Sequence, residues 1–375
     1  MNFSALDRYL HSIPETFGTP GLSCRVFYKG KEVYRTDVGV RDLFSGEKMQ
    51  GDEQFFVFSA TKPITAAASM QLFERGILSP NDYLSYYFPE FDKMSCMGVN
   101  GWPYQAKEKI TLRHLLSMTA GLTYDFNTPA IRKVVEESQG KAGTVDIVRA
   151  MSKSMLQFEP GTHWRYCEGH DIMAAVIEVA TGMPYEEYVK QNIFDPLGMT
   201  SSCFHKSQAD PARMTFCYDT APDGSLIRRE RFGFDITPAY VSGGASLITT
   251  ADDYIRFVDA LSCGGLGSTG KRILLSATVE LMHQNLLTPE MRRDIPWRPW
   301  IGYGYGYGVR TLVDKGEAGS LGPVGEFGWD GLKGAYLIAD TTNEISLFYV
   351  EQTGLHKDEI FPRVRNLLYT GLFSD

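Results

Sequence analysis

Hydrophobic and polar residues are spaced differently at the two ends of the chain and in its middle. In residues 24–40, two β-rich runs of roughly alternating residues flank Lys29-Gly30-Lys31, which predicts an antiparallel hairpin. Residues 334–338 and 345–351 flank a polar turn and predict a second hairpin. Residues 356–372 carry apolar side chains at helical spacing. Strands are therefore expected near both ends of the chain.

The middle of the chain has helical rather than alternating periodicity. Apolar residues recur at helical spacing in segments 110–117, 145–155, 170–181 and 185–193, and glycines follow at plausible helix ends. By contrast, tyrosines alternate with glycines in residues 302–308, which favours a strand over a phosphate-binding loop.

These patterns favour a discontinuous architecture of α+β class, in which both chain ends join in one antiparallel sheet and the middle forms a helical insert. We expect residues 1–80 and 236–375 to form the mixed α/β domain and residues 81–235 the mainly helical domain. The active site is expected in the cleft between them.

Composition and charge narrow the range of functions. The 375 residues are 43% hydrophobic and 22% charged, which is typical of a globular protein with a core. The net charge of −8 disfavours nucleic acid and anionic membrane surfaces as partners. Six scattered cysteines, a polar start and the lack of long apolar runs favour a cytoplasmic protein with reduced thiols. No metal-binding or nucleotide-binding motif is present, so no cofactor or metal is expected.

One serine-lysine pair has the context of a catalytic site. A lysine three residues after a serine on a helix can accept the serine's proton if it is kept neutral. Four pairs have this spacing: Ser45/Lys48, Ser59/Lys62, Ser138/Lys141 and Ser268/Lys271. Only the pair of Ser59 and Lys62 lacks an intervening glycine, and it opens a helix-like stretch after an apolar run. A structural alternative is an N-cap serine beside a surface lysine.

Five blocks extend this motif into a family resemblance. In order they are FSATKPITAAASMQLFERGILSPNDYLSYYFPEF, ITLRHLLSMTAGL, FEPGTHWRYCEGHDIMAAVIEVATG, IFDPLGMTSS and GGASLITTADDYIRFVDAL. The chain resembles the serine β-lactamase-like family, which groups class C β-lactamases, D,D-peptidases, D-aminopeptidases and family VIII carboxylesterases. This resemblance implies the β-lactamase/transpeptidase-like fold and a serine nucleophile.

The resemblance implies roles for individual residues. Ser59 matches the family's nucleophile, Lys62 its partner lysine, and Tyr166 the tyrosine of the Y-x-N motif. A phenol near a lysine ammonium can be shifted toward phenolate, so Tyr166 is expected to pass a proton between the serine and the leaving group. The N–H groups of Ser59 and Leu332 are expected to hold the oxyanion.

Two departures from the family pattern bear on the substrate. Glu168 replaces the usual asparagine, and Trp329 replaces the lysine or histidine of the third motif, Gly328-Trp329-Asp330-Gly331. Glu168, Trp329, Asp330 and Gly331 are the expected substrate-binding residues. We expect Trp329 to supply an apolar wall, as in the similar family VIII esterases, and Glu168 to disfavour anionic substrates or to bind an amine. A structural role for Glu168 is the alternative.

The sequence thus favours a serine hydrolase that cleaves small carboxylic esters through an acyl-enzyme. The alternatives are hydrolysis of D-amino-acid amides or short peptides, acyl transfer, β-lactamase or D,D-peptidase activity, and a catalytically inactive binding protein of the same fold. Residues 289–300, which include Trp297 and Trp300, are expected to form a loop beside the site. The expected partner is a small ester or amide, and the sequence leaves the oligomeric state open.

Overall fold

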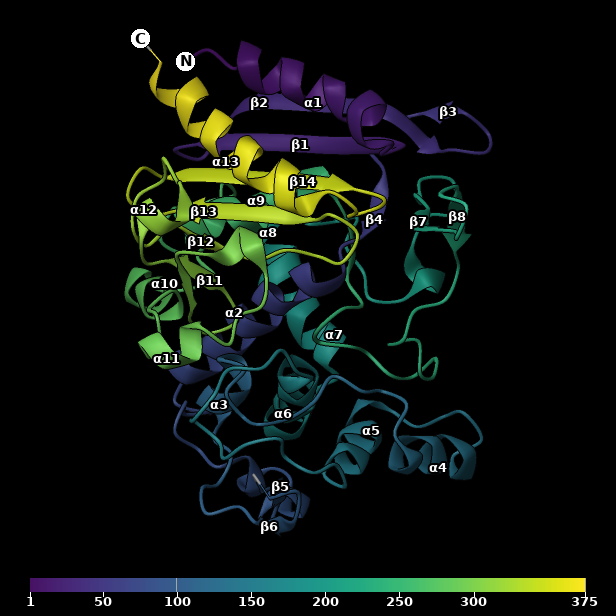
Figure 1. Ribbon diagram of the computed structural model, residues 1–375, viewed down its shortest axis with the longest axis vertical. Coiled ribbons are helices and arrows are strands. Elements are labelled where there is room, and N and C mark those ends of the chain that lie inside the picture. The colour runs from purple at the N-terminus through teal and green to yellow at the C-terminus, as the bar shows by residue number, and fades with distance from the viewer. Residues whose placement is uncertain (99, 375) are drawn as a thin grey trace.

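The computed structural model describes residues 1–98 and 100–374. Its main sheet is antiparallel and combines strands from both ends of the chain (Figure 1). In spatial order the strands are β10 (Tyr303–Tyr305), β11 (Arg310–Leu312), β12 (Phe327–Gly328), β13 (Tyr336–Asp340), β14 (Ile345–Glu351), β1 (Gly21–Tyr28), β2 (Lys31–Asp42) and β3 (Glu47–Lys48). Both expected hairpins, β1–β2 and β13–β14, are confirmed, and β14 pairs with β1 to join the two chain ends.

Helices cover both faces of this sheet. Helices α1 (Ser4–Phe17) and α13 (Lys357–Phe373) lie together on one face, and α9 (Ala251–Ser262) lies on the other (Figure 1). One apolar cluster fills the space between the sheet and the α1–α13 layer. A second and larger cluster lies on the α9 side and continues into the helical region. The sheet is therefore the middle layer of an α/β/α sandwich.

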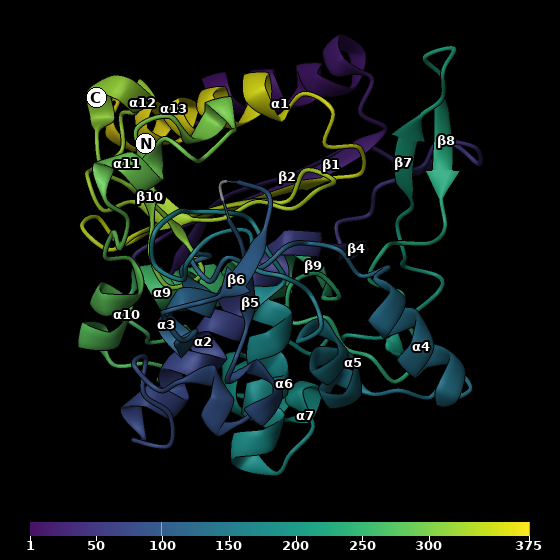
Figure 2. The ribbon, with the colours of Figure 1, turned by 60° about the horizontal axis from the view of Figure 1, so that its bottom comes forward.

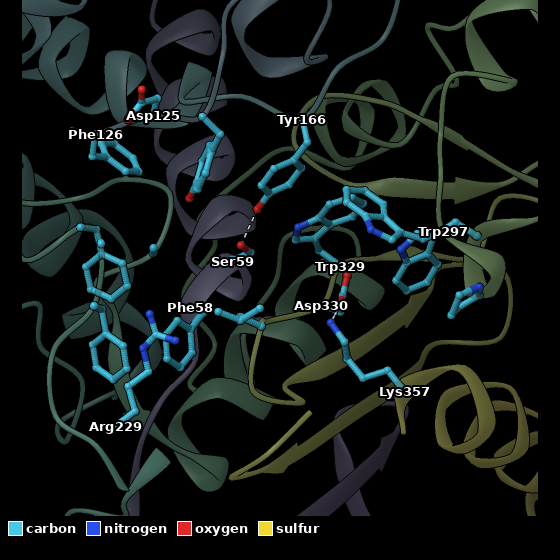
Figure 3. Close-up of a pocket in the computed structure, with 18 of the residues that line it drawn as sticks. Phe58, Ser59, Asp125, Phe126, Tyr166, Arg229, Trp297, Trp329, Asp330 and Lys357 are labelled. Carbon is cyan, nitrogen blue, oxygen red and sulfur yellow. Dashed lines mark hydrogen bonds and ion pairs between the residues drawn. The ribbon is translucent and has the colours of Figure 1, made fainter. Parts of the chain in front are cut away.

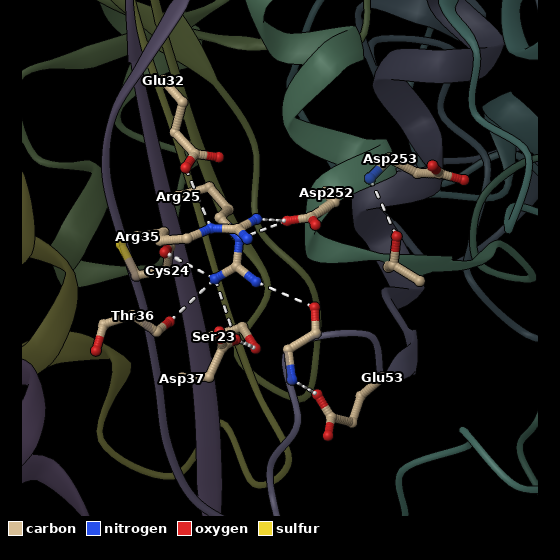
Figure 4. Close-up of polar contacts among 12 residues, drawn as sticks. Ser23, Cys24, Arg25, Glu32, Arg35, Thr36, Asp37, Glu53, Asp252 and Asp253 are labelled. Carbon is tan, nitrogen blue, oxygen red and sulfur yellow. Dashed lines mark hydrogen bonds and ion pairs between the residues drawn. The ribbon is translucent and has the colours of Figure 1, made fainter.

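A buried arginine links the sheet to α9 (Figure 4). The Arg25 side chain on β1 is fully buried and donates to Asp37 on β2 at 3.0 Å and to Asp252 on α9 at 2.5 Å. It also donates to the carbonyl of Gly51 at 3.2 Å. Burial of a charge is costly unless its donors are satisfied, and these contacts satisfy them with groups from distant segments.

The rest of the chain is mainly helical. Its helices are α2 (Thr61–Glu74), α3 (Leu112–Leu116), α4 (Pro129–Glu137), α5 (Thr144–Met151), α6 (Gly169–Thr181), α7 (Tyr185–Val189), α8 (Asp195–Leu197), α10 (Ser276–Met282), α11 (Pro289–Arg292) and α12 (Lys315–Ala318). Three small strand pairs accompany them: β4 (Gln54–Phe56) with β9 (Ile248–Thr250), β5 (Ser95–Met97) with β6 (Pro103–Gln105), and β7 (Cys217–Thr220) with β8 (Leu226–Arg229). Figure 2 shows the β7–β8 hairpin at the side of the molecule. Among the described residues, no helix is both long and apolar enough to span a bilayer.

Candidate active site

Ser59 lies between a short strand and a buried helix. Strand β4 leads into the 3-10 turn Phe58–Ala60, and α2 begins at Thr61 directly afterwards. Phe58 has φ = 48°, a left-handed backbone conformation that is uncommon for an aromatic residue. Such conformations cost energy and occur preferentially at functional sites. The sharp turn places Ser59 at the N-terminal end of α2, as the helical pattern after it indicated.

The three expected catalytic side chains converge (Figure 3). The Ser59 hydroxyl and the Tyr166 hydroxyl form a short hydrogen bond. Lys62 Nζ lies 3.3 Å from Ser59 Oγ, donates to the carbonyl of Gly244 at 2.8 Å and lies 4.6 Å from the centre of the Tyr166 ring. These distances are within reach for proton transfer among the three groups.

Burial controls the protonation of this trio. Lys62 is completely buried, and desolvation lowers its pKa to about 8, while the nearby charge of Asp171 opposes that shift. Burial also raises the pKa of Tyr166, although its hydrogen bond to Ser59 acts in the opposite direction. The structure therefore differs from the expectation of a phenolate: Tyr166 keeps its proton, and Lys62 is the group that can lose one near neutral pH.

Asp171 is a buried acid that the sequence analysis missed. It lies on α6 and accepts hydrogen bonds from Tyr240 at 2.9 Å and from Ser242 at 2.5 Å. A Cβ atom at Gly244 would lie 2.6 Å from Asp171 Oδ2 and 3.2 Å from Lys62 Nζ, so only a glycine fits between them. Asp171 thus orders the segment whose carbonyl accepts from Lys62. The available signal was an acidic residue directly before the apolar run of residues 172–177 in α6.

Ser59 opens into a pocket of about 570 Å³ with aromatic walls (Figure 3). On one side is a phenyl wall, formed by Phe58, Phe126, Phe232 and Phe234. On the other is an indole wall, formed by Trp297, Trp300 and Trp329. The segment of residues 289–300 therefore borders the site as expected, although its first residues form helix α11 and the pocket is lined by Trp297, Pro299 and Trp300.

The indole wall packs against the catalytic tyrosine. The Tyr166 ring lies 5.5 Å from the Trp297 ring in an edge-to-face arrangement and 6.1 Å from the Trp329 ring in a stacked one, measured between ring centres. Trp329 is nearly fully buried, in keeping with the apolar wall expected from the third motif. These contacts fix the orientation of the phenol and leave its hydroxyl to Ser59.

The third motif brings a backbone turn close to the nucleophile. A Cβ atom at Gly331 would lie 2.2 Å from the carbonyl oxygen of Val57, so this approach requires glycine. Leu332 follows, is exposed and lines the pocket. In the described part of the chain, neither the Ser59 N–H nor the Leu332 N–H donates a hydrogen bond to the protein. Both are free to bind a developing oxyanion.

The structure does not place Glu168 in the pocket wall. Its side chain is 1% exposed, it precedes α6, and one carboxyl oxygen has no hydrogen-bond partner among the described residues. Burial raises the pKa of Glu168 to about 8, so the carboxyl group is mostly protonated at neutral pH. Glu168 therefore differs from the expected role of a charged, substrate-facing acid, and the structural alternative fits its position.

Other polar residues line the pocket. Asp330, expected there, forms an ion pair with Lys357 at 2.9 Å, so its charge is compensated. Tyr124 and Arg229 also line the pocket and were not found from the sequence. The Tyr124 hydroxyl lies 3.5 Å from Lys62 Nζ, and the two tyrosine rings, Tyr124 and Tyr166, are 5.0 Å apart. No short motif marks either residue, because distant segments bring them to the site.

Ser59, Lys62 and Tyr166 meet between an antiparallel sheet and a helical region. This arrangement defines the protein as a serine hydrolase of the β-lactamase/transpeptidase-like fold. The Beta-lactamase family model matches residues 6–366, and the chain belongs to this family.

The chain is similar to several esterases. Esterase EstB of Burkholderia gladioli is 28% identical to it, over 86% of this chain and 83% of EstB. Lovastatin esterase of Penicillium rubens is 30% identical, over 78% of each protein. The solved structure of EstCE1, described as a hydrolase with promiscuous acyltransferase activity, is 26% identical, superposes with a TM-score of 0.80 and is covered over 98% of both chains.

Proposed function

We propose that the protein hydrolyses small carboxylic esters through an acyl-enzyme on Ser59. Neutral Lys62 accepts the Ser59 proton, directly or through Tyr166, while Ser59 Oγ forms a bond to the ester carbonyl carbon. The N–H groups of Ser59 and Leu332 stabilise the oxyanion. When the intermediate collapses, Tyr166 donates its proton to the departing alcohol and is reprotonated from Lys62. In the second half of the reaction, water attacks the acyl carbon and gives its proton to Lys62, directly or through Tyr166. The bond between Ser59 Oγ and the acyl carbon then breaks, Ser59 regains its proton, and the acid is released.

The observation that carries this proposal is the contact of Ser59 with Tyr166 and Lys62 at an aromatic-walled pocket. An ester fits these walls because the ester group is neutral and can place an apolar segment on either side of the serine. The third-motif position that carries a cation in penicillin-recognising relatives holds Trp329, which gives no charge-assisted contact to a β-lactam carboxylate. The esterases among the similar proteins support the same reading.

The test combines labelling with a substrate panel. A fluorophosphonate should label Ser59 of the wild-type protein, and labelling should be lost in Ser59→Ala. Short p-nitrophenyl esters should be cleaved, whereas D- and L-amino-acid p-nitroanilides and a chromogenic cephalosporin should be poor substrates. Ser45→Ala is a matched control, because Ser45 has the same spacing to a lysine but is exposed on a turn and does not line the pocket. An unlabelled and inactive wild-type protein would support the binding-protein alternative instead.

Acyl transfer to an alcohol is a second candidate. The pocket has apolar walls on both sides of Ser59, so an apolar alcohol can take the place of the departing one. The similarity to EstCE1 also favours this reading. If transfer occurs, adding an aliphatic alcohol to an ester reaction should produce a new ester at the expense of free acid, which chromatography would detect.

We also propose a reducing compartment, the cytoplasm, for this protein. All six cysteines are free thiols in the structure, and four of them are buried. A reducing environment keeps such thiols unpaired.

A further inference from the structure

The β7–β8 hairpin is fastened to the turn that carries Leu332. Lys333, the next residue, is nearly buried and donates to the Tyr218 carbonyl at 2.6 Å and to Asp219 Oδ1 at 2.5 Å. The Tyr218 N–H donates to the Gln352 carbonyl at 3.0 Å. Although the hairpin lies at the side of the molecule (Figure 2), its inner strand is thus held in place beside the active site.

This attachment presents one guanidinium to the pocket. Arg229, the last residue of β8, donates from Nη1 to Asp219 Oδ2 at 2.9 Å and from Nε to the Arg231 carbonyl at 3.1 Å. In the described chain its Nη2 has no hydrogen-bond partner, and the side chain is 38% exposed. Because Asp219 also pairs with Lys333, this group of two cations and one carboxylate keeps a net positive charge.

The site geometry indicates which part of an ester faces Arg229. Tyr166 donates the proton to the departing alcohol, and its ring packs against Trp297 and Trp329, so the alcohol part lies at the indole wall. The acyl part then lies on the opposite side, where Arg229 stands beside Phe58 (Figure 3). The Arg229 guanidinium carbon lies 5.9 Å from the centre of the Phe232 ring.

We propose that Arg229 binds a carboxylate at the far end of the acyl group, so that the preferred substrates are monoesters of dicarboxylic acids. This inference rests on the proposed ester hydrolysis. A guanidinium with unused N–H donors binds carboxylates through charge-assisted hydrogen bonds, and the aromatic wall excludes water from part of that contact. Asp125 and Asp358 also line the pocket, and they disfavour an anion elsewhere along it.

The test compares two substrates with the same diacid chain: the mono-4-nitrophenyl ester of suberic acid, and the same ester with its free carboxylate methylated. The measured quantity is the ratio of kcat/KM for the acid to kcat/KM for the methyl ester. This ratio should fall by about tenfold or more in Arg229→Gln, the size expected for a lost charged hydrogen bond. Arg229→Lys should retain part of the ratio because it keeps the charge without the planar fork.

Arg231→Gln is the matched control, because this neighbouring arginine is exposed and does not line the pocket. Its ratio should equal that of the wild type. In the wild type, raising NaCl from about 20 mM to about 500 mM should lower the ratio through screening, independently of any variant. A ratio that changes neither in Arg229→Gln nor with salt overturns the inference. Failure of the wild type to cleave either ester overturns the proposed function instead.

Discussion

Lys62 is the residue whose surroundings most affect catalysis. It has no exposed surface, and its ammonium lies against the Gly244 carbonyl and the rings of Tyr124 and Tyr166 rather than in water. The resulting pKa of about 8 leaves a useful neutral fraction at physiological pH, whereas an ordinary lysine would have almost none. Catalytic bases work best when their pKa is near the working pH.

We therefore expect kcat/KM for a p-nitrophenyl ester to rise about tenfold per pH unit below pH 8 and to level off above it. The rise follows the loss of the Lys62 proton in the free enzyme, whose pKa is about 8. Lys62→Arg should lower kcat/KM by about 10²–10⁴-fold, because a guanidinium stays protonated. The measurement is a pH-rate profile corrected for spontaneous hydrolysis.

Lys48→Arg provides the matched control, because Lys48 follows a serine at the same spacing but is exposed on β3. It should leave the profile unchanged. A profile without any inflection near pH 8 would argue against Lys62 as the proton acceptor.

The buried carboxyl group of Glu168 leads to a prediction about stability rather than catalysis. Its pKa is raised from 4.5 to about 8 in the folded protein, so its contribution to stability is complete below about pH 4.5 and is lost as pH rises through 8. The neutral variant Glu168→Gln avoids this loss. Its Tm relative to the wild type should therefore increase steadily between pH 5 and pH 8.5, as followed by circular dichroism.

Glu136→Gln, at an exposed position on α4, is the control and should show no such trend. Because Glu168 does not line the pocket, Glu168→Asn should not alter the preference between amine-bearing and anionic acyl substrates. A changed preference would return Glu168 to the substrate-facing role that the sequence suggested.

At the scale of elements, hydrophobic periodicity predicted the helices and strands whose formation depends mainly on local sequence. The β1–β2 hairpin and α6 follow from alternation and helical spacing, and a proline-containing helix after Ser59 follows from the same reasoning. The small β7–β8 hairpin was missed because each strand is only four residues long and apolar and polar residues do not alternate along CYDT or LIRR. Arg229 was missed with it, since its place in the pocket depends on the distant Lys333 that anchors the hairpin.

The turn after β12 is an element whose geometry can be tested directly. In Gly331→Ala the added Cβ would collide with the Val57 carbonyl oxygen at 2.2 Å, so the turn must move away from the nucleophile. The Leu332 N–H would move with it. We expect kcat for ester hydrolysis to fall by about 10²–10³-fold, the usual effect of losing one oxyanion donor. Steady-state kinetics would measure it.

Gly143→Ala is the control for that substitution, because the nearest atom to its Cβ would lie 4.0 Å away and its φ of −86° suits alanine. It should retain wild-type kcat. If Gly331→Ala also retained it, Leu332 could not be the second oxyanion donor.

At the scale of the whole molecule, the larger core crosses the predicted domain boundary. Phe56 and Val350 from the two ends of the chain belong to the same apolar cluster as Leu116 from the middle. The catalytic group is divided in the same way, with Ser59 and Leu332 on the sheet side and Tyr166 in the middle segment. The family resemblance anticipated this division, whereas the continuous core depends on packing that periodicity does not reveal.

We therefore expect one cooperative unfolding transition rather than separate loss of the sheet and of residues 81–235. In urea, far-UV circular dichroism, tryptophan fluorescence and ester hydrolysis should give coincident midpoints.

Arg25→Met should shift all three midpoints together and lower the free energy of unfolding by about 3–5 kcal/mol, because it leaves Asp37 in a largely buried site without its ion-pair partner. Arg35→Met removes an exposed partner of Asp252, which also pairs with Arg25, and should cost about 1 kcal/mol or less. If Arg25→Met shifted the circular dichroism midpoint but not the activity midpoint, the sheet and the helical region would be independent folding units.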